Sequence, residues 1–323
     1  MEPKPITLRD IWMARKRISP IVEKTPLIYS PKLSEFAETS VHLKLENLNV
    51  SGSFKIRGAA NKILSLTPEE QKIGVTTFST GNFGMAVAHI AKTLGIRAVI
   101  CISNRVPEVK VNALKESGAE IDIYGGSQDD AERRSYQLQQ EHGLTVVHPF
   151  DDQHIIAGQG TIGLELLEDI PEIDTVIGGL SGGGLHSGIG SALKLTDPSI
   201  KVLGVSTAQG PTMYESIRAG KPVIVQEQDT LADSLLGGIG LDNRYTFNMV
   251  QQFVDEIILL NEDEFAKGMA FMLENHRMVI EGAAASGIGA ILNRKADLGE
   301  HVAVVVSGCS VDLATILEIA GNY

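Results

Sequence analysis

Cysteine and basic side chains are scarce in this sequence of 323 residues. The two cysteines, Cys101 and Cys309, lie far apart in apolar, strand-like surroundings, which excludes a disulfide framework and a CxxC metal site. Such a chain is typical of a reducing cytoplasm, which is the location we predict. Lysine and arginine number 28 against 40 acidic residues, giving a formal charge of −12. This charge disfavours nucleic acid and anionic membranes as partners and favours a small-molecule ligand.

Long apolar runs are also missing. No segment approaches the roughly 18 consecutive apolar residues that a membrane-spanning helix needs, and residues 1–5 contain no apolar core of a secretory signal. We therefore expect neither a membrane partner nor a targeting segment. Hydrophobic residues still make up 43% of the chain, which is enough for the core of one large or two medium domains.

Short β-branched runs alternate with amphipathic stretches in two series. Strands are predicted at 75–78, 98–103, 120–124 and 145–148 in the first series, and at 174–177, 201–205, 256–260 and 302–306 in the second. Between the first two strands, apolar residues recur at helical spacing: Phe83, Val87, Ile90 and Leu94. This alternation predicts an α/β fold with two parallel-sheet domains, helices on both faces of each sheet, and a ligand cleft between the sheets.

Lys55 lies where a strand-like run at 41–45 gives way to a helical pattern. Ser53 is the expected N-cap, so Lys55 belongs to the first helical turn. The positive field of the helix start and the neighbouring Arg57 both favour the neutral amine and so lower the pKa of Lys55. A neutral lysine amine can form an imine with a carbonyl compound. A surface lysine after a turn is the alternative that this segment alone leaves open.

A glycine-rich turn, Gly182-Gly183-Gly184-Leu185, follows the strand at 174–177 and precedes a helical stretch. Consecutive backbone N–H groups at a helix start bind phosphate, and glycines allow a close approach. The turn has neither the Lys-Ser/Thr ending of a Walker A loop nor the spacing of GxGxxG. A tight turn without a ligand explains the glycines equally well.

Three more segments carry polar groups at the ends of predicted strands or the starts of helices. The turn 79–82 (Ser79-Thr80-Gly81-Asn82) can hold a carboxylate, and Ser307 ends the strand at 302–306. Glu281 precedes a small-residue helix start. Each has a common structural explanation, namely capping or a turn for the first two and helix-dipole complementarity for Glu281.

A reactive lysine, a phosphate cradle without its own basic residue, a carboxylate-binding turn and a strand-end hydroxyl together fit an aldehyde with a phosphate and a heteroaromatic ring. That ligand is pyridoxal 5′-phosphate. In sequence order, the segments resemble those of fold type II pyridoxal-phosphate enzymes, which are tryptophan synthase β-like, and most closely those of threonine/serine dehydratases and serine racemases. The resemblance spans essentially the whole chain. It implies a large cofactor-binding domain at 1–68 and 149–323, and a small substrate-side domain at 69–148.

The resemblance also implies a role for individual residues. Lys55 would be the catalytic residue, joined to the cofactor by an imine and later acting as acid and base. The implied cofactor contacts are Lys55, Phe54, Asn82 at the ring hydroxyl, Gly182, Gly183, Gly184 and Leu185 at the phosphate, Glu281 near the ring, and Ser307 at the pyridine nitrogen. The implied substrate contacts are Ser79, Thr80, Gly81, Asn82 and Gly238. A neutral hydroxyl at the pyridine nitrogen favours β-elimination over a long-lived carbanion.

The sequence departs from the family pattern at several positions. Phe83 replaces a histidine and Ser181 replaces a fourth glycine of the phosphate loop. Thr80 stands where the racemases use a serine hydroxyl as the second acid/base, which disfavours racemisation. The acidic ligands of the family's divalent-cation site would fall at Ser206 and Thr212, so no metal is expected there.

The implied activity is that of a cytoplasmic, homodimeric lyase. It would release ammonia and a 2-oxo acid from a 3-hydroxy amino acid such as L-threonine or L-serine. A second hypothesis arises from residues 232–247, which resemble dehydratases of hydroxyectoine utilisation, with Gly237 and Gly238 leaving room for a bulkier substrate. A third is a nucleotide-binding or regulatory protein that uses the loop 182–184.

Overall fold

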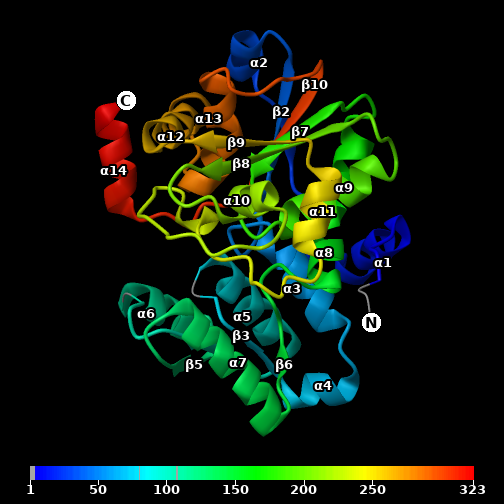
Figure 1. The fold of residues 1–323 in the computed structure, drawn as a ribbon, viewed down its shortest axis with the longest axis vertical. Helices are drawn as coiled ribbons and strands as arrows, with labels where there is room; N and C mark the ends of the chain where they lie inside the picture. The colour runs from blue at the N-terminus through cyan, green and yellow to red at the C-terminus, as the bar shows by residue number, and fades with distance from the viewer. Residues whose placement is uncertain (1–3, 80, 107) are drawn as a thin grey trace.

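A computed structural model describes residues 4–79, 81–106 and 108–323. Its strands form two separate sheets, which lie one above the other in Figure 1 with α3 between them. The larger sheet has the order β1 (Leu27–Tyr29), β2 (Ser40–Leu45), β10 (His301–Val306), β7 (Thr175–Gly179), β8 (Lys201–Thr207), β9 (Glu256–Leu260). The smaller sheet has the order β5 (Glu120–Ile123), β4 (Ala98–Ile102), β3 (Val75–Thr77), β6 (Thr145–Val146).

Both sheets are parallel apart from β1, which pairs antiparallel with β2. The predicted α/β fold class with two parallel sheets is therefore confirmed, and each predicted strand overlaps an observed one. β1 was not predicted, and β6 is two residues shorter than the strand expected at 145–148. The domain boundaries at 68/69 and 148/149 stay a prediction.

Helices cover the sheets and connect the strands. Those of the first half are α1 (Leu8–Ile18), α2 (Pro31–Ala37), α3 (Lys55–Leu64), α4 (Pro68–Ile73), α5 (Asn82–Leu94), α6 (Glu108–Glu116), α7 (Gln128–His142) and α8 (Gln153–Asp169). Those of the second half are α9 (Gly184–Lys194), α10 (Thr212–Ala219), α11 (Thr246–Phe253), α12 (Glu262–His276), α13 (Ser286–Leu292) and α14 (Leu313–Asn322). Short 3₁₀ turns are η1 (Glu46–Leu48), η2 (Asp233–Leu235) and η3 (Gly282–Ala285).

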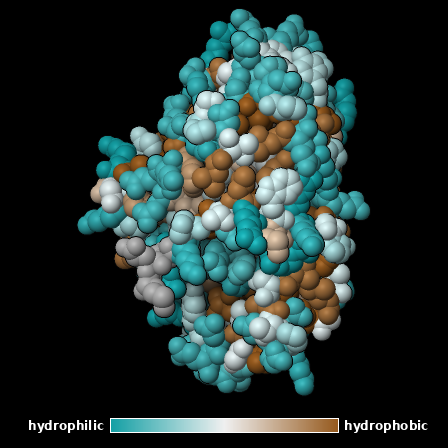
Figure 2. Space-filling model, turned by 90° about the vertical axis from the view of Figure 1, so that its right-hand side faces the viewer, coloured by the Kyte–Doolittle hydropathy of each residue, from teal (hydrophilic) through white to brown (hydrophobic). Residues whose placement is uncertain are grey.

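The hydrophobic pattern explains how these elements pack. On α5, Phe83, Val87 and Ile90 are buried in one cluster with residues of α1, α3 and β3, as their spacing predicts. The strand β10 is buried along 302–306, as expected for a central parallel strand covered on both faces. The outer surface carries apolar patches among hydrophilic residues on the face shown in Figure 2. Among the described residues, no helix is long and apolar enough to cross a membrane.

Candidate active site

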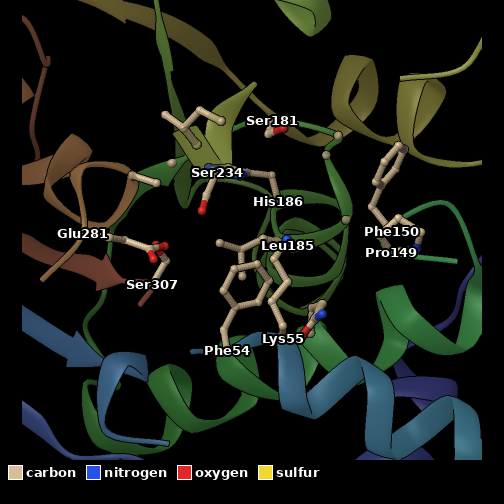
Figure 3. A pocket seen from close by; sticks show the side chains of 17 residues that line it. Phe54, Lys55, Pro149, Phe150, Ser181, Leu185, His186, Ser234, Glu281 and Ser307 are labelled. Atoms are coloured by element: carbon tan, nitrogen blue, oxygen red, sulfur yellow. The ribbon is translucent and has the colours of Figure 1, made fainter. Parts of the chain in front are cut away.

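A pocket opens at the carboxyl ends of β7 and β10, where parallel sheets commonly place ligands. Figure 3 shows Phe54 and Lys55 entering it from α3, with Glu281 and Ser307 on one wall. Its predicted lining residues are Phe54, Lys55, Gly182, Gly183, Gly184, Leu185, Glu281 and Ser307. A second, larger cleft shares Lys55 with this pocket and is lined by four further predicted residues, Ser79, Gly81, Asn82 and Gly238. The structure therefore brings these residues together around Lys55, and Thr80 lies outside the described residues.

Lys55 is the first residue of α3 and is fixed by the end of β10. The Phe54 N–H donates to the Ser307 carbonyl at 3.0 Å, and Ser53 forms a bridge with Gly308. This bridge replaces the cap predicted for Ser53, whose buried hydroxyl has no hydrogen-bond partner in the described part of the chain. Phe54 is the N-cap residue. The backbone contact explains how two segments far apart in the sequence meet in one pocket.

Burial lowers the pKa of the Lys55 amine, while the charge of Glu281 acts in the opposite direction. The lowered pKa agrees with the sequence analysis, but its cause differs. Arg57, which was expected to repel the ammonium, instead lies in a buried ion-pair cluster with Glu46 and Glu165. Desolvation in the pocket thus favours the neutral, nucleophilic amine.

The glycine turn forms the start of α9. Gly183 is its N-cap with φ of 86°, and no side chain of residues 4–79, 81–106 or 108–323 caps this end. A Cβ at Gly182 would lie 2.6 Å from the Phe150 ring, and a Cβ at Gly184 would lie 3.0 Å from the Phe150 Cβ. Packing against Phe150 therefore requires glycine at these positions. Because no described side chain caps the start of α9 at these glycines, the N–H groups of its first turn are available to an anion.

Asn82 and Glu281 are joined across the cleft. The Asn82 amide nitrogen donates to both Glu281 carboxylate oxygens, at 3.0 and 2.9 Å, and the Ser310 N–H donates to one of them at 3.1 Å. Burial raises the pKa of Glu281, helped by the charge of Asp233 and opposed by Asn82. A side chain at Gly308 would meet this pair, since its Cβ would lie 2.8 Å from the Glu281 Oε1. The start of α5 is thereby linked to the larger sheet.

The predicted substrate turn precedes α5. A Cβ at Gly84 would lie 2.0 Å from the Ser79 carbonyl oxygen, so only glycine allows the turn to fold back on the helix. The structure places Ser79 and Gly81 in the cleft beside Asn82. Gly238 lines the same cleft, and a Cβ there would meet nothing within 4 Å.

The family model for pyridoxal-phosphate dependent enzymes matches residues 18–308. The chain belongs to this family. It is 42% identical over 314 residues to an L-threonine ammonia-lyase of Thermotoga maritima, covering 97% of this chain and 78% of that protein. The structure of maize serine racemase superimposes with a TM-score of 0.92 at 34% identity, covering 99% of this chain and 98% of the other. Processed threonine deaminase isoform 2 of Solanum lycopersicum gives 0.89 at 27% identity, covering 99% and 96%.

These matches confirm the predicted fold type II enzyme and its cofactor, pyridoxal phosphate, and the predicted relationship to threonine dehydratases and serine racemases. The pocket of this pyridoxal-phosphate enzyme also fits the cofactor physically. The uncapped helix start at Gly183 and Gly184 suits a phosphate, and the amine of Lys55 suits an aldehyde. The individual roles predicted for the lining residues are taken up as proposals below.

Sequence reasoning missed several residues of the site. Phe150, behind the glycine turn, and Gln159, buried on α8, line the pocket, and His148 lines the cleft. His148 is the last residue of the predicted strand 145–148 and Phe150 follows it, so their place at a strand's carboxyl end was a usable signal. No local pattern marks Gln159. Among the described residues, no group of three or more His, Cys, Asp or Glu could hold a metal ion, and the metal-free state stays a prediction.

Proposed function

We propose that this protein is a pyridoxal-phosphate-dependent ammonia-lyase acting on L-threonine, L-serine or a related 3-hydroxy amino acid. One observation carries the proposal: a buried amine of lowered pKa, Lys55, lies in the same pocket as the uncapped start of α9. The similarity to an L-threonine ammonia-lyase over nearly the whole chain supports this reaction class.

Each wall of the pocket has a proposed binding role. Lys55 would hold the cofactor through its aldehyde, with loss of water, and the first-turn N–H groups at 182–185 would hold the phosphate. Phe54, Glu281 and Ser307 line the same pocket. Phe54 and Glu281 would border the ring, and the Ser307 hydroxyl would serve its nitrogen. The bound cofactor supplies an electron sink for the bonds at Cα of the substrate.

The cleft positions the substrate for elimination. The turn 79–82, with Gly238 opposite, receives the amino acid carboxylate and brings Cα beside Lys55. Once the substrate amine has replaced Lys55 at the cofactor, the freed Lys55 amine would take the Cα proton, and the β-hydroxyl would leave with a proton as water. The remaining enamine takes up one water and yields the 2-oxo acid and ammonia. Burial lowers the pKa of Lys55 and so increases the share of its neutral, basic amine.

Replacement of Lys55 tests the proposal. The purified protein should be yellow, and borohydride should fix the cofactor covalently on Lys55. The K55A variant should lose this trapping and the release of 2-oxobutanoate from L-threonine by at least about 10³-fold. K72A, on the short exposed helix α4, is the matched control and should behave as the wild type. Full turnover by K55A would refute the proposed mechanism.

A substrate panel tests the finer assignment. L-Threonine, L-serine, hydroxyectoine and its ring-opened products should be compared, with D-serine formation measured in parallel. Preference for L-threonine or L-serine with release of ammonia would support the lyase. Preference for the hydroxyectoine-derived compounds would favour the second hypothesis, for which the relatives named above give no support. Dominant D-serine formation would instead indicate racemisation.

The assembly and location also stay proposals. We propose a homodimer in the cytoplasm, binding neither nucleic acid nor membranes. Light scattering after size-exclusion chromatography should give twice the chain mass of 34.7 kDa. A single-chain mass would refute the dimer.

A further inference from the structure

His148 has no role in the reaction described above, although it lies in the substrate cleft. It follows β6 and lines the cleft together with Lys55 and Ser79. The neighbouring strand β3 leads directly to the turn 79–82, and the Thr77 hydroxyl donates to the Val147 carbonyl at 2.8 Å. His148 is therefore held next to the proposed carboxylate site.

The imidazole of His148 is fixed in orientation. Its Nδ1 accepts hydrogen bonds from two backbone N–H groups, those of Phe150 at 3.3 Å and Asp151 at 2.9 Å. The ring also makes edge-on contacts with Phe78 and Phe150, at centroid distances of 5.3 and 4.7 Å. Since Nδ1 acts as an acceptor, the ring proton of the neutral imidazole is on Nε2.

The ring is also neutral under ordinary conditions. Burial lowers the pKa of His148 to about 4, against the opposing charges of Asp151, Asp152 and Asp242 and together with that of Lys62. A neutral ring with Nδ1 occupied has one polar function left to offer, an N–H donor at Nε2.

The two ring neighbours of His148 each adjoin one of the proposed anion sites. Phe150 packs against Gly182 and Gly184 of the phosphate turn, and Phe78 immediately precedes Ser79 of the carboxylate turn. A 3-hydroxy amino acid that lies between these sites, with Cα at Lys55, has its β-oxygen as the remaining acceptor. The Nε2–H of His148 is a hydrogen-bond donor, and the β-oxygen of the substrate can accept it.

We propose that His148 donates its Nε2–H to the β-oxygen of the substrate and so selects hydroxylated amino acids and orients their leaving group. This inference rests on the proposed lyase function. It assigns a specificity-determining hydrogen bond to a residue that lies outside the cofactor and carboxylate sites.

Two variants separate the two nitrogens of the ring. In H148N, the side-chain oxygen replaces Nδ1 as acceptor for the backbone, but nothing replaces the Nε2 donor. In H148Q, the terminal amide can place an N–H near the Nε2 position. We expect H148N to lower kcat/KM for L-threonine and L-serine roughly 10- to 100-fold, and H148Q to recover most of this loss.

Substrates without a β-oxygen provide the matched control. β-Chloro-L-alanine has a good leaving group and no hydroxyl, and L-2-aminobutyrate cannot eliminate at all. Turnover of the first and the inhibition constant of the second should change less than about threefold in H148N. The thermal midpoint and the bound cofactor content should stay those of the wild type.

Several results would overturn the inference. An equal loss of kcat/KM for L-threonine and β-chloro-L-alanine in H148N would show that His148 contacts the substrate carboxylate instead of the β-oxygen. Wild-type kinetics in H148N would show that His148 does not contact the substrate. If H148N does not fold, a wild-type crystal structure with the reduced adduct of cofactor and L-serine decides. A distance above about 4 Å from Nε2 to the β-oxygen would refute the hydrogen bond. If the wild type turns over no hydroxy amino acid, the proposed function itself fails, which is a separate outcome.

Discussion

Arg57 is the centre of a buried charge cluster and belongs to the first turn of α3, as Lys55 does. Its guanidinium bonds Glu46 through Nε and a terminal nitrogen, each at 2.8 Å, and Glu165 at 2.6 and 2.9 Å. Lys44 is a second cation bonded to Glu165, at 2.7 Å. All four charged side chains are buried, at 0–5% exposure. Two cations and two carboxylates therefore balance one another where β2, η1, α3 and α8 meet.

Replacing Arg57 by Met should destabilise the protein strongly. The side chain of Met fills similar space but leaves Glu46 without the cation that forms its ion pair, because Lys44 pairs with Glu165 and acts on Glu46 only through its charge. Removing one partner of a buried ion pair typically costs about 3–5 kcal/mol. With a urea m value of about 3 kcal/mol/M, the unfolding midpoint of cofactor-saturated R57M should fall by about 1–2 M relative to the wild type.

Two further variants make this reasoning testable. R97M breaks the exposed Arg97–Glu120 pair and should cost about 0–1 kcal/mol, because water screens that pair. E46Q/R57M removes the stranded charge and should regain roughly half of the loss, since Thr25 and Asn49 can still donate to residue 46. A loss in R57M no larger than that in R97M would refute the argument.

The pH dependence gives an independent check on the same cluster. Burial alone would raise the pKa of Glu46, but Arg57 outweighs it and the pKa is lowered below the ordinary value of 4.5. A lowered pKa contributes stability above pH 4.5, and that stability is lost as pH falls through the folded-state pKa. R57M lacks the contribution of Arg57 to this lowering. The difference in free energy of unfolding between the wild type and R57M should therefore decrease as the pH falls. A gap that widens in acid would contradict this assignment.

Three further predictions concern individual residues. G84A should raise KM for the amino acid at least about 10-fold, because its Cβ would collide with the Ser79 carbonyl, whereas G321A, in open space, should behave as the wild type in steady-state kinetics. In the cofactor-free protein, bonding of pyridoxal phosphate to Lys55 should have a pH midpoint below 10.5, since burial lowers the pKa of this amine. A midpoint at or above 10.5, read from cofactor absorbance, would contradict this. Cys101 should resist a thiol reagent at pH 8 until the protein is unfolded, because burial raises its pKa to about 11.

Local patterns were sufficient to predict most strands of the two sheets and to single out segments that line the pocket and the cleft. Parallel strands that are buried on both faces consist largely of β-branched and other apolar residues. This pattern made β7 and β10 recognisable in the sequence. Glycines at 182–184 and Lys55 follow strand-like runs, and strand ends gather at one edge of a parallel sheet. The sequence order of these segments then indicated the family.

Pairings between distant residues could not be predicted in the same way. The antiparallel β1 is only three residues long, which is too short to show a period. Nothing adjacent to Arg57 indicates that Glu165 is its partner, and a lone arginine near a lysine suggests repulsion instead. Serine is a common N-cap residue, but the backbone of Ser53 forms a β-bridge with Gly308 instead. In each case a long-range contact overrides the local preference.

Three such long-range contacts together determine where the Lys55 amine lies. The hydrogen bond from the Phe54 N–H to the Ser307 carbonyl fixes the start of α3. The ion pairs of Arg57 with Glu46 and Glu165 fix its first turn. The Asn82–Glu281 bonds hold the start of α5 against the same edge of the larger sheet. Because none of these contacts uses Lys55 itself, its side chain remains free to react while its backbone is held rigidly. A reactive lysine that must meet both a cofactor and a substrate requires this combination.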